Sequence, residues 1–162
     1  MTWIRAHHLF RADIADFDVG RILIDSGSLV NVLFADTFAG LEIERQSLNK
    51  DITPLLSFSG DVVELIGSIQ LPFAIGTSPR RAFVYTHFLV VDCPTAYNAI
   101  IGRPALTRMK AILSPHMLLL KFPHTSGSAR RIGNPDVETK AARITGRFQP
   151  NHAGRQGRVR AS

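Results

Sequence analysis

The stretch RILIDSGSLVN, residues 21–31, decides the fold. In it, three apolar residues, Ile22 to Ile24, run straight into the carboxylate of Asp25, and small residues centred on Gly27 follow. A carboxylate that ends an apolar strand is partly desolvated, which costs free energy unless the group is paired or used. Gly27 would let backbone or substrate approach closely. Taken alone, Asp-Ser-Gly more often marks an ordinary loop after a strand than a functional site. The surrounding sequence has to decide between these two interpretations.

Short apolar runs alternate with turn residues through the first 123 residues. Residues 80–92 are apolar on both faces of a predicted strand, so we expect this strand to be covered on both sides. Further strands are expected in four places: a pair within 8–25, a set within 54–76 that turns at Ser59-Gly60 and again near Gly67, one ending at Ile101, and one within 114–123.

Two short helices complete the predicted elements. Apolar residues recur at roughly helical spacing within 31–41, where Asn31 fits the N-cap and Gly40 the C-terminal stop. Pro104 suits the first turn of a second helix, because its missing N–H costs nothing there. Many short strands with two brief helices predict a mostly β fold, a small closed β barrel, over residues 12–123.

Residues 124–162 form a tail of different composition. They hold eight Lys and Arg and two acids, whereas residues 1–123 hold 11 of each sign, so the tail carries the whole net charge of +6. The tail has few large apolar residues and cannot bury enough surface to offset the entropy of ordering it. We therefore expect a basic, disordered linker. Contact with nucleic-acid phosphates is the alternative, weakly supported because Phe148 is its single aromatic residue.

The composition excludes several classes of protein. No window of 18 apolar residues is present, so no transmembrane helix is expected, and the first residues lack the apolar region of a signal peptide. The single cysteine, Cys93, excludes an intramolecular disulfide and fits a reducing, intracellular compartment. No histidine lies near Cys or acid at metal-ligand spacing, and phosphate-binding glycine loops and the Gly-x-Ser-x-Gly motif are absent. We expect neither a metal nor a cofactor.

A second motif lies downstream of DSGS. The segment FLVVDCPTAYNAIIGRPAL, residues 88–106, places two apolar residues before Gly-Arg at a strand-to-helix junction, and a hairpin with a flexible tip lies between the two motifs. In this order, the chain resembles the retropepsin-like aspartic proteases. It is most similar to the protease segment of plant Ty3/gypsy-type retrotransposon gag-pol polyproteins. The resemblance covers roughly residues 12–123.

The resemblance implies a role for each residue of DSGS. Asp25 matches the catalytic aspartate. Ser26 matches the residue whose hydroxyl braces the two active-site loops of a dimer against each other. Gly27 matches the glycine whose carbonyl faces substrate, and Ser28 matches the small residue at the floor of the pocket.

Two further elements of the site follow from the same resemblance. One is the apolar-apolar-Gly element that supports the catalytic loop, matched by Ile100, Ile101 and Gly102. The other is the tip of a flap that closes over substrate, matched by Phe58, Ser59 and Gly60.

Aspartic proteolysis needs two carboxylates that share one proton, because two like charges at that distance cannot both ionise. One carboxylate activates a water and the other hydrogen-bonds the scissile carbonyl. A chain of 162 residues with one DSG is too short for a second lobe. The second carboxylate must therefore be Asp25 of another copy, which implies a C₂ homodimer acting on a polypeptide.

The chain departs from the family pattern at Arg103. This arginine matches one that, in retroviral members, pairs with an acid shortly after the catalytic aspartate, but Leu29 and Val30 stand there. Two interpretations stay open. The chain is an active dimeric aspartic endopeptidase that processes its own polyprotein, or it is a catalytically silent remnant that serves as a dimerisation or binding module. The short chain favours a polyprotein fragment or an isolated gene remnant.

Overall fold

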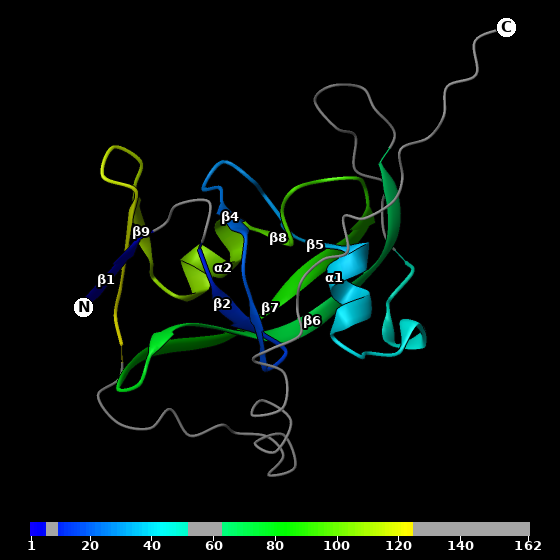
Figure 1. Cartoon of the computed structure of the whole chain (residues 1–162), viewed down its shortest axis with the longest axis horizontal. Helices are drawn as coiled ribbons and strands as arrows, with labels where there is room; N and C mark the ends of the chain where they lie inside the picture. Colours follow the sequence, from blue (N-terminus) through cyan, green and yellow to red (C-terminus); the bar gives the residue numbers. More distant parts are fainter. Residues whose placement is uncertain (6–9, 52–62, 125–162) are drawn as a thin grey trace, which may run out of the picture.

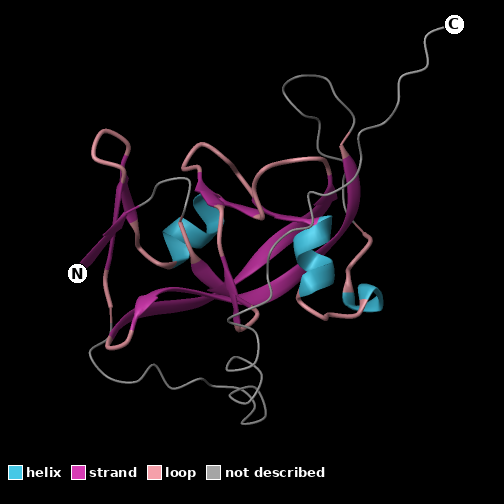
Figure 2. Cartoon of the chain, in the orientation of Figure 1, coloured by secondary structure: helices cyan, strands magenta, loops and turns pink. Residues whose placement is uncertain are grey.

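The computed structural model describes residues 1–5, 10–51 and 63–124. Within these ranges the chain forms a large and a small β-sheet with two short α-helices (Figures 1 and 2). The large sheet has the order β3-β2-β6-β7-β5-β8-β4, and the small one the order β1-β10-β9. The strands are β1 (Thr2–Arg5), β2 (Ala12–Ile14), β3 (Phe17–Val19), β4 (Ile22–Ile24), β5 (Asn31–Phe34), β6 (Glu64–Thr77), β7 (Arg80–Asp92), β8 (Ala99–Ile101), β9 (Ile112–Ser114) and β10 (Leu119–Phe122). The helices are α1 (Ala35–Gly40), the 3₁₀ turn η1 (Arg45–Ser47) and α2 (Arg103–Arg108).

The large sheet is built on the long antiparallel hairpin of β6 and β7, which runs across the molecule in Figure 1. The predicted turn near Gly67 is wrong, because β6 continues through it with a bulge between Leu65 and Gly67. A glycine is needed there, since a Cβ would lie 2.7 Å from the Cβ of Leu48, in the segment that bridges β6 through Asn49 and Ser68. The glycine therefore serves a close approach and not a reversal of the chain.

The sheet curls into a half barrel, which confirms the mostly β class of the predicted fold. Strand β5 pairs in parallel with β7, and β4 pairs in parallel with β8. Because the sheet is curved, β4 at its one edge comes near the residues that lead into β2. There the N–H of Ile22 donates to the carbonyl of Phe10 at 3.1 Å. Closure is limited to that contact, because β3 and β4 remain the edge strands of the described sheet. The closed barrel that was predicted is therefore a half barrel with adjacent edges.

The core fills the concave side of this sheet. Phe73 of β6 and Phe88 of β7 meet edge to face at 6.3 Å, and both are fully buried. Strand β7 is buried most along one face, where Thr86 and Phe88 point inward, while Tyr85 and His87 on the other face are exposed. The prediction that this strand is covered on both sides holds at its carboxyl end, where Val91 on that second face is buried, and fails at Tyr85 and His87, because an antiparallel sheet can keep part of one face in solvent.

Two other local predictions change in the structure. Residues 8–25 hold three strands instead of two, since β2 and β3 form a tight hairpin whose turn residues, Ala15 and Asp16, have φ of 51° and 70°. The first helix begins at Ala35 after the N-cap Phe34, and not at Asn31, although it ends at Gly40 as predicted. The second helix, α2, has Pro104 in its first turn as predicted.

Four predictions fall on residues outside the described ranges: the hairpin turn at Ser59-Gly60, the flap tip at Phe58, Ser59 and Gly60, and, beyond residue 124, the disordered linker at 124–162 with its alternative of nucleic-acid contact. Where the structure does describe the chain, its helices are too short to cross a membrane.

Candidate active site

The position of Asp25 follows from the pairing of two parallel strands. Strands β4 and β8 pair in register, Ile24 with Ile101, so their carboxyl ends meet at the same edge of the sheet. Asp25 directly follows β4, and its N–H donates to the carbonyl of Ile101 at 2.9 Å. The two sequence motifs are thereby brought together at one place, the DSGS loop on one side and the Gly102-Arg103 junction on the other.

The DSGS loop is a tight turn closed by its own carboxylate. The N–H of Gly27 donates to Oδ1 of Asp25 at 2.9 Å, and the N–H of Ser28 donates to its carbonyl at 3.2 Å. The Ser28 hydroxyl donates to the carbonyl of Val30 at 2.8 Å, which fixes the end of the loop. These contacts give the small residues after Asp25 a physical reason, since a turn of this kind needs short side chains.

Asp25 is exposed in the single chain, as are Ser26 and Gly27. The apolar run before Asp25 predicted a partly desolvated carboxylate, and for one chain alone that prediction is wrong. The turn carries Asp25 past the end of the apolar strand to the surface. Its free oxygen is therefore open to water or to another molecule.

The junction between β8 and α2 supports the loop through backbone contacts. The N–H of Arg103 donates to the carbonyl of Ser28 at 2.9 Å. A methyl group at Gly102 would overlap the carbonyl oxygen of Val30 and lie 2.9 Å from that of Ser28, so only glycine lets the two segments lie this close. The side chain of Arg103 donates from Nε to the carbonyl of Ser26 at 3.3 Å, and this carbonyl is the described partner that the sequence could not name.

We predict that Gly102→Ala displaces the loop that carries Asp25, because the added methyl group has no room, and that any activity that depends on Asp25 falls by about a hundredfold in kcat/KM. Stability should also fall, by about 1–3 kcal/mol, as in other overpacked sites. Steady-state kinetics and urea unfolding measure the two effects. Gly20→Ala is the matched control, since its methyl group meets only the flexible end of Arg11. Equal kinetics for the two variants would contradict the tight packing at Gly102.

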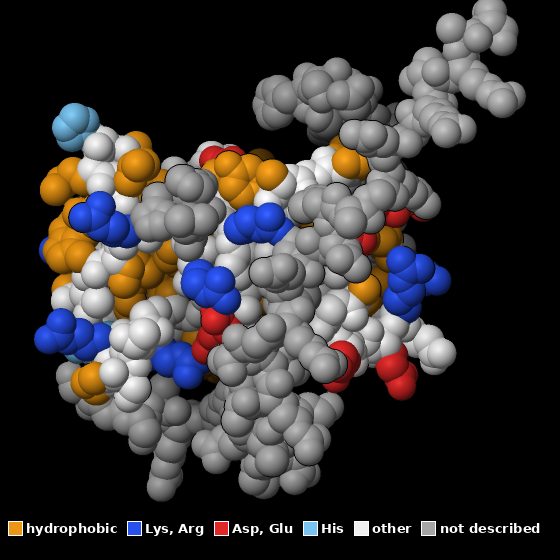
Figure 3. Space-filling model, viewed as in Figure 1, with side chains coloured by type: hydrophobic (Ala, Val, Ile, Leu, Met, Phe, Trp, Pro, Cys, Tyr) orange, Lys and Arg blue, Asp and Glu red, His pale blue; other side chains and the backbone are white. Residues whose placement is uncertain are grey.

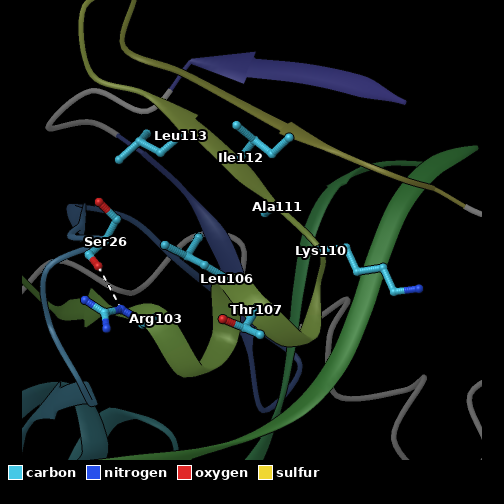
Figure 4. Close-up of a pocket in the computed structure, with 8 residues that line it drawn as sticks. All are labelled: Ser26, Arg103, Leu106, Thr107, Lys110, Ala111, Ile112 and Leu113. Atoms are coloured by element: carbon cyan, nitrogen blue, oxygen red, sulfur yellow. Dashed lines mark hydrogen bonds between the residues drawn. The ribbon is translucent and has the colours of Figure 1, made fainter.

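A cavity of about 470 Å³ opens beside the loop (Figure 4). Ser26 and Arg103 stand at one side of it, and the other lining side chains come from α2, from the segment between α2 and β9, and from β9 itself. They are mostly apolar, with one further cation, in the set Leu106, Thr107, Lys110, Ala111, Ile112 and Leu113. The cavity therefore adjoins the candidate catalytic loop without containing Asp25.

Sequence reasoning missed the buried polar group behind the loop. Asn31 is 1% exposed, and its side chain touches both the Gly102 junction and β7. The only sign of this role in the sequence is that Asn31 directly precedes the apolar run VLF. The helical spacing of the residues that follow led to the prediction of Asn31 as a helix N-cap.

One carboxylate outside the loop is perturbed. Partial burial raises the pKa of the Asp13 carboxyl, while its ion pair with Arg81 acts in the opposite direction. An acid with a shifted pKa can mark a functional site. Here the ion pair between Asp13 and Arg81 joins β2 to β7, so a structural role accounts for the shift. Among the described residues, no group of three His, Cys, Asp or Glu side chains could hold a metal ion.

Comparison with solved structures gives the class of fold. The retroviral protease-like domain of Ddi1 from Leishmania major matches with a TM-score of 0.54 at 16% identity, over 71% of this chain and 86% of that one. A retropepsin-like aspartic protease from Rickettsia conorii matches with a TM-score of 0.54 at 16% identity, over 75% and 89%. The EIAV protease complexed with the inhibitor HBY-793 is 25% identical over 65% of this chain and 89% of that one, with a TM-score of 0.47.

The first two matches define the fold as that of the retropepsin-like aspartic proteases. No protein-family model and no curated protein matches the sequence.

Proposed function

We propose that this chain is one subunit of an aspartic endopeptidase whose catalytic carboxylate is Asp25. The observation that carries the proposal is the exposed Asp25 carboxylate in a DSGS turn held against Gly102 and Arg103. This arrangement stands in a half barrel of the retropepsin type. A fold can host several functions, so the site and not the fold supports the chemistry.

The proposed reaction uses two copies of Asp25 that share one proton. The ionised carboxylate takes a proton from a water, which attacks the scissile carbonyl, while the protonated carboxyl hydrogen-bonds the carbonyl oxygen. In each subunit, the Gly27 N–H on Oδ1 fixes the orientation of its carboxylate.

A second copy is needed because one chain supplies one such loop. Two features support contact with another chain next to Asp25: Leu29 is 71% exposed, and the apolar cavity opens beside Ser26. Further large apolar side chains lie exposed around the small sheet, at the end of the molecule where β1 and β9 lie (Figures 1 and 3). They are Met1, Trp3, Ile112, Met117 and Leu118. Association of two chains would remove this surface from water.

The proposed substrate is a polypeptide. Processing of a retrotransposon polyprotein, in a plant, is the finer proposal, and it rests on the resemblance of DSGS and YNAIIGRP to such elements.

The test is cleavage of a peptide library by the full 162-residue chain between about pH 4 and pH 7. We expect endoproteolytic cleavage that an aspartic-protease transition-state mimic abolishes. A pure, folded dimer that cleaves nothing and does not bind the mimic would refute the proposal.

A second candidate is a catalytically silent module of the same fold, used for dimerisation or binding. It is favoured by the residues after the catalytic loop, because Leu29 and Val30 provide no acid for Arg103, whose described contact is one exposed 3.3 Å bond. The same library separates the two candidates: a dimer that forms but leaves every peptide intact is the outcome this candidate predicts.

A further inference from the structure

Asn31, the first residue of β5, uses nearly all of its side-chain hydrogen-bonding capacity in the protein interior. Its Nδ2 donates to Oγ1 of Thr86 at 3.0 Å and to the carbonyl of His87 at 2.8 Å. Its Oδ1 accepts the N–H of Gly102 at 2.9 Å. Burying an amide is costly unless its groups are paired, and here both N–H groups and the oxygen have partners.

The three bonds join three separate segments. Asn31 is the first residue after the DSGS loop to belong to a strand, β5. Its partners Thr86 and His87 belong to strand β7, and its partner Gly102 lies at the junction between β8 and α2. Strand β7 pairs with β5 and β6 on its two sides, so it is an interior strand of the sheet. Asn31 thereby ties the junction to the interior of the sheet.

Gly102, whose N–H is bound by Asn31, is also the residue against which the catalytic loop packs. Gly102 packs against the carbonyl oxygens of Val30 and Ser28, and the next N–H, that of Arg103, donates to Ser28. A shift of Gly102 would therefore shift the loop and, with it, Asp25.

The other side-chain link between the two motifs is weak by comparison. The Arg103 guanidinium reaches the carbonyl of Ser26 at 3.3 Å, in an exposed position where water competes for both groups. The bonds of Asn31 are shorter, and those to Thr86 and Gly102 are buried, where water does not compete.

We propose that Asn31 is a positioning residue for the catalytic loop: its amide fixes the Gly102 N–H, and through it the place of the Asp25 carboxylate. The inference rests on the proposed function for its consequence in catalysis. The mechanical part, the hold on the junction, does not depend on turnover.

The chain offers a matched control for this residue. Asn98 is also a buried asparagine, at 4% exposure, and its amide is also paired: Nδ2 donates to the carbonyl of Gly20 at 2.8 Å, and Oδ1 accepts from the Thr37 hydroxyl at 3.3 Å. These bonds reach the β3–β4 connection and α1, away from the Gly102 junction. Removing either amide leaves similar groups unpaired, so both variants should lose stability.

The experiment compares Asn31→Ala and Asn98→Ala in the full chain, by kinetics and by amide hydrogen exchange. Active sites are counted with a tight-binding transition-state analogue. We expect kcat of Asn31→Ala to fall by about a hundredfold with KM changed little, as for a misplaced reacting group. For Asn98→Ala, kcat per folded subunit should stay within about twofold of the wild type. Equal kcat losses in the two variants would overturn the positioning role and leave Asn31 a stability residue.

Hydrogen exchange tests the same inference without turnover, so it separates a failure here from a failure of the proposed function. In Asn31→Ala, the amides of Gly102, Arg103 and Ser28 should exchange faster than in the wild type; in Asn98→Ala they should not. An inactive wild type would sink the proposed function alone, whereas unchanged exchange at Gly102 would sink the positioning role. If Asn31→Ala does not fold, Thr86→Val takes its place. It removes one acceptor of the amide with little change of shape, and unchanged exchange at Gly102 would again overturn the inference.

Discussion

Asp25→Asn is expected to abolish peptide cleavage, with a loss of about 10⁴-fold in kcat or to the level of background. Asparagine keeps the shape of the side chain, and its Oδ1 can still accept the N–H of Gly27, so the DSGS turn should persist. It cannot take a proton from water or share one with the partner carboxyl, so the step that activates water is lost. Steady-state kinetics with the peptide found in the library measures the effect.

The control for this variant is Asp36→Asn, which changes an exposed aspartate of the same chemistry in the first turn of α1. It should retain full activity, and both variants should unfold at nearly the same urea concentration as the wild type. If cleavage survives in Asp25→Asn, another residue or a contaminant performs the chemistry.

Activity per chain should fall steeply when the enzyme is diluted over about a hundredfold range through its dimer dissociation constant. Each chain carries one DSGS loop, and among the described residues of a lone chain the exposed carboxylate of Asp25 has no second carboxyl beside it that could share its proton. In the proposed dimer, separation of the subunits would therefore remove the dyad itself. The measurement is specific activity against concentration, with sedimentation velocity at the same concentrations.

A tandem fusion of two chains is the control for the dilution experiment, because linking the subunits makes their association intramolecular. Its specific activity should stay constant where that of the single chain falls. If a chain that sediments as a monomer cleaves peptide at full rate, the shared-dyad mechanism is wrong.

Local pattern was sufficient for much of the fold. The strand at residues 80–92, the helix stop at Gly40 and the helix that starts around Pro104 depend on periodicity, backbone freedom or a missing N–H, all of which are visible in a few residues. The same holds for the mostly β class. The two motifs of the site could likewise be recognised in the sequence, because each of them, DSGS and AIIGRP, is a continuous stretch of residues.

Register and curvature were not visible locally. An amide before VLF reads equally well as a helix cap or as the start of a strand, and only the pairing of β5 with β7 decides for the strand. Gly67 reads as a turn until Leu48 is found packed against it. The half barrel, too, depends on which strands end up at the edges of the sheet.

The sequence by itself determined the candidate chemistry: a carboxylate at the end of a strand, a turn of small residues after it, and a Gly-Arg junction that matches it. Tertiary structure decided how these parts meet. The bonds from Asn31 to β7 and to Gly102, and from Arg103 to Ser26, span 55, 71 and 77 residues. No local pattern encodes such contacts, because they depend on the register of strands that pair only after the chain has folded. The exposure of Asp25 was decided in the same way, by a turn that carries it beyond the strand that the sequence assigned to the core.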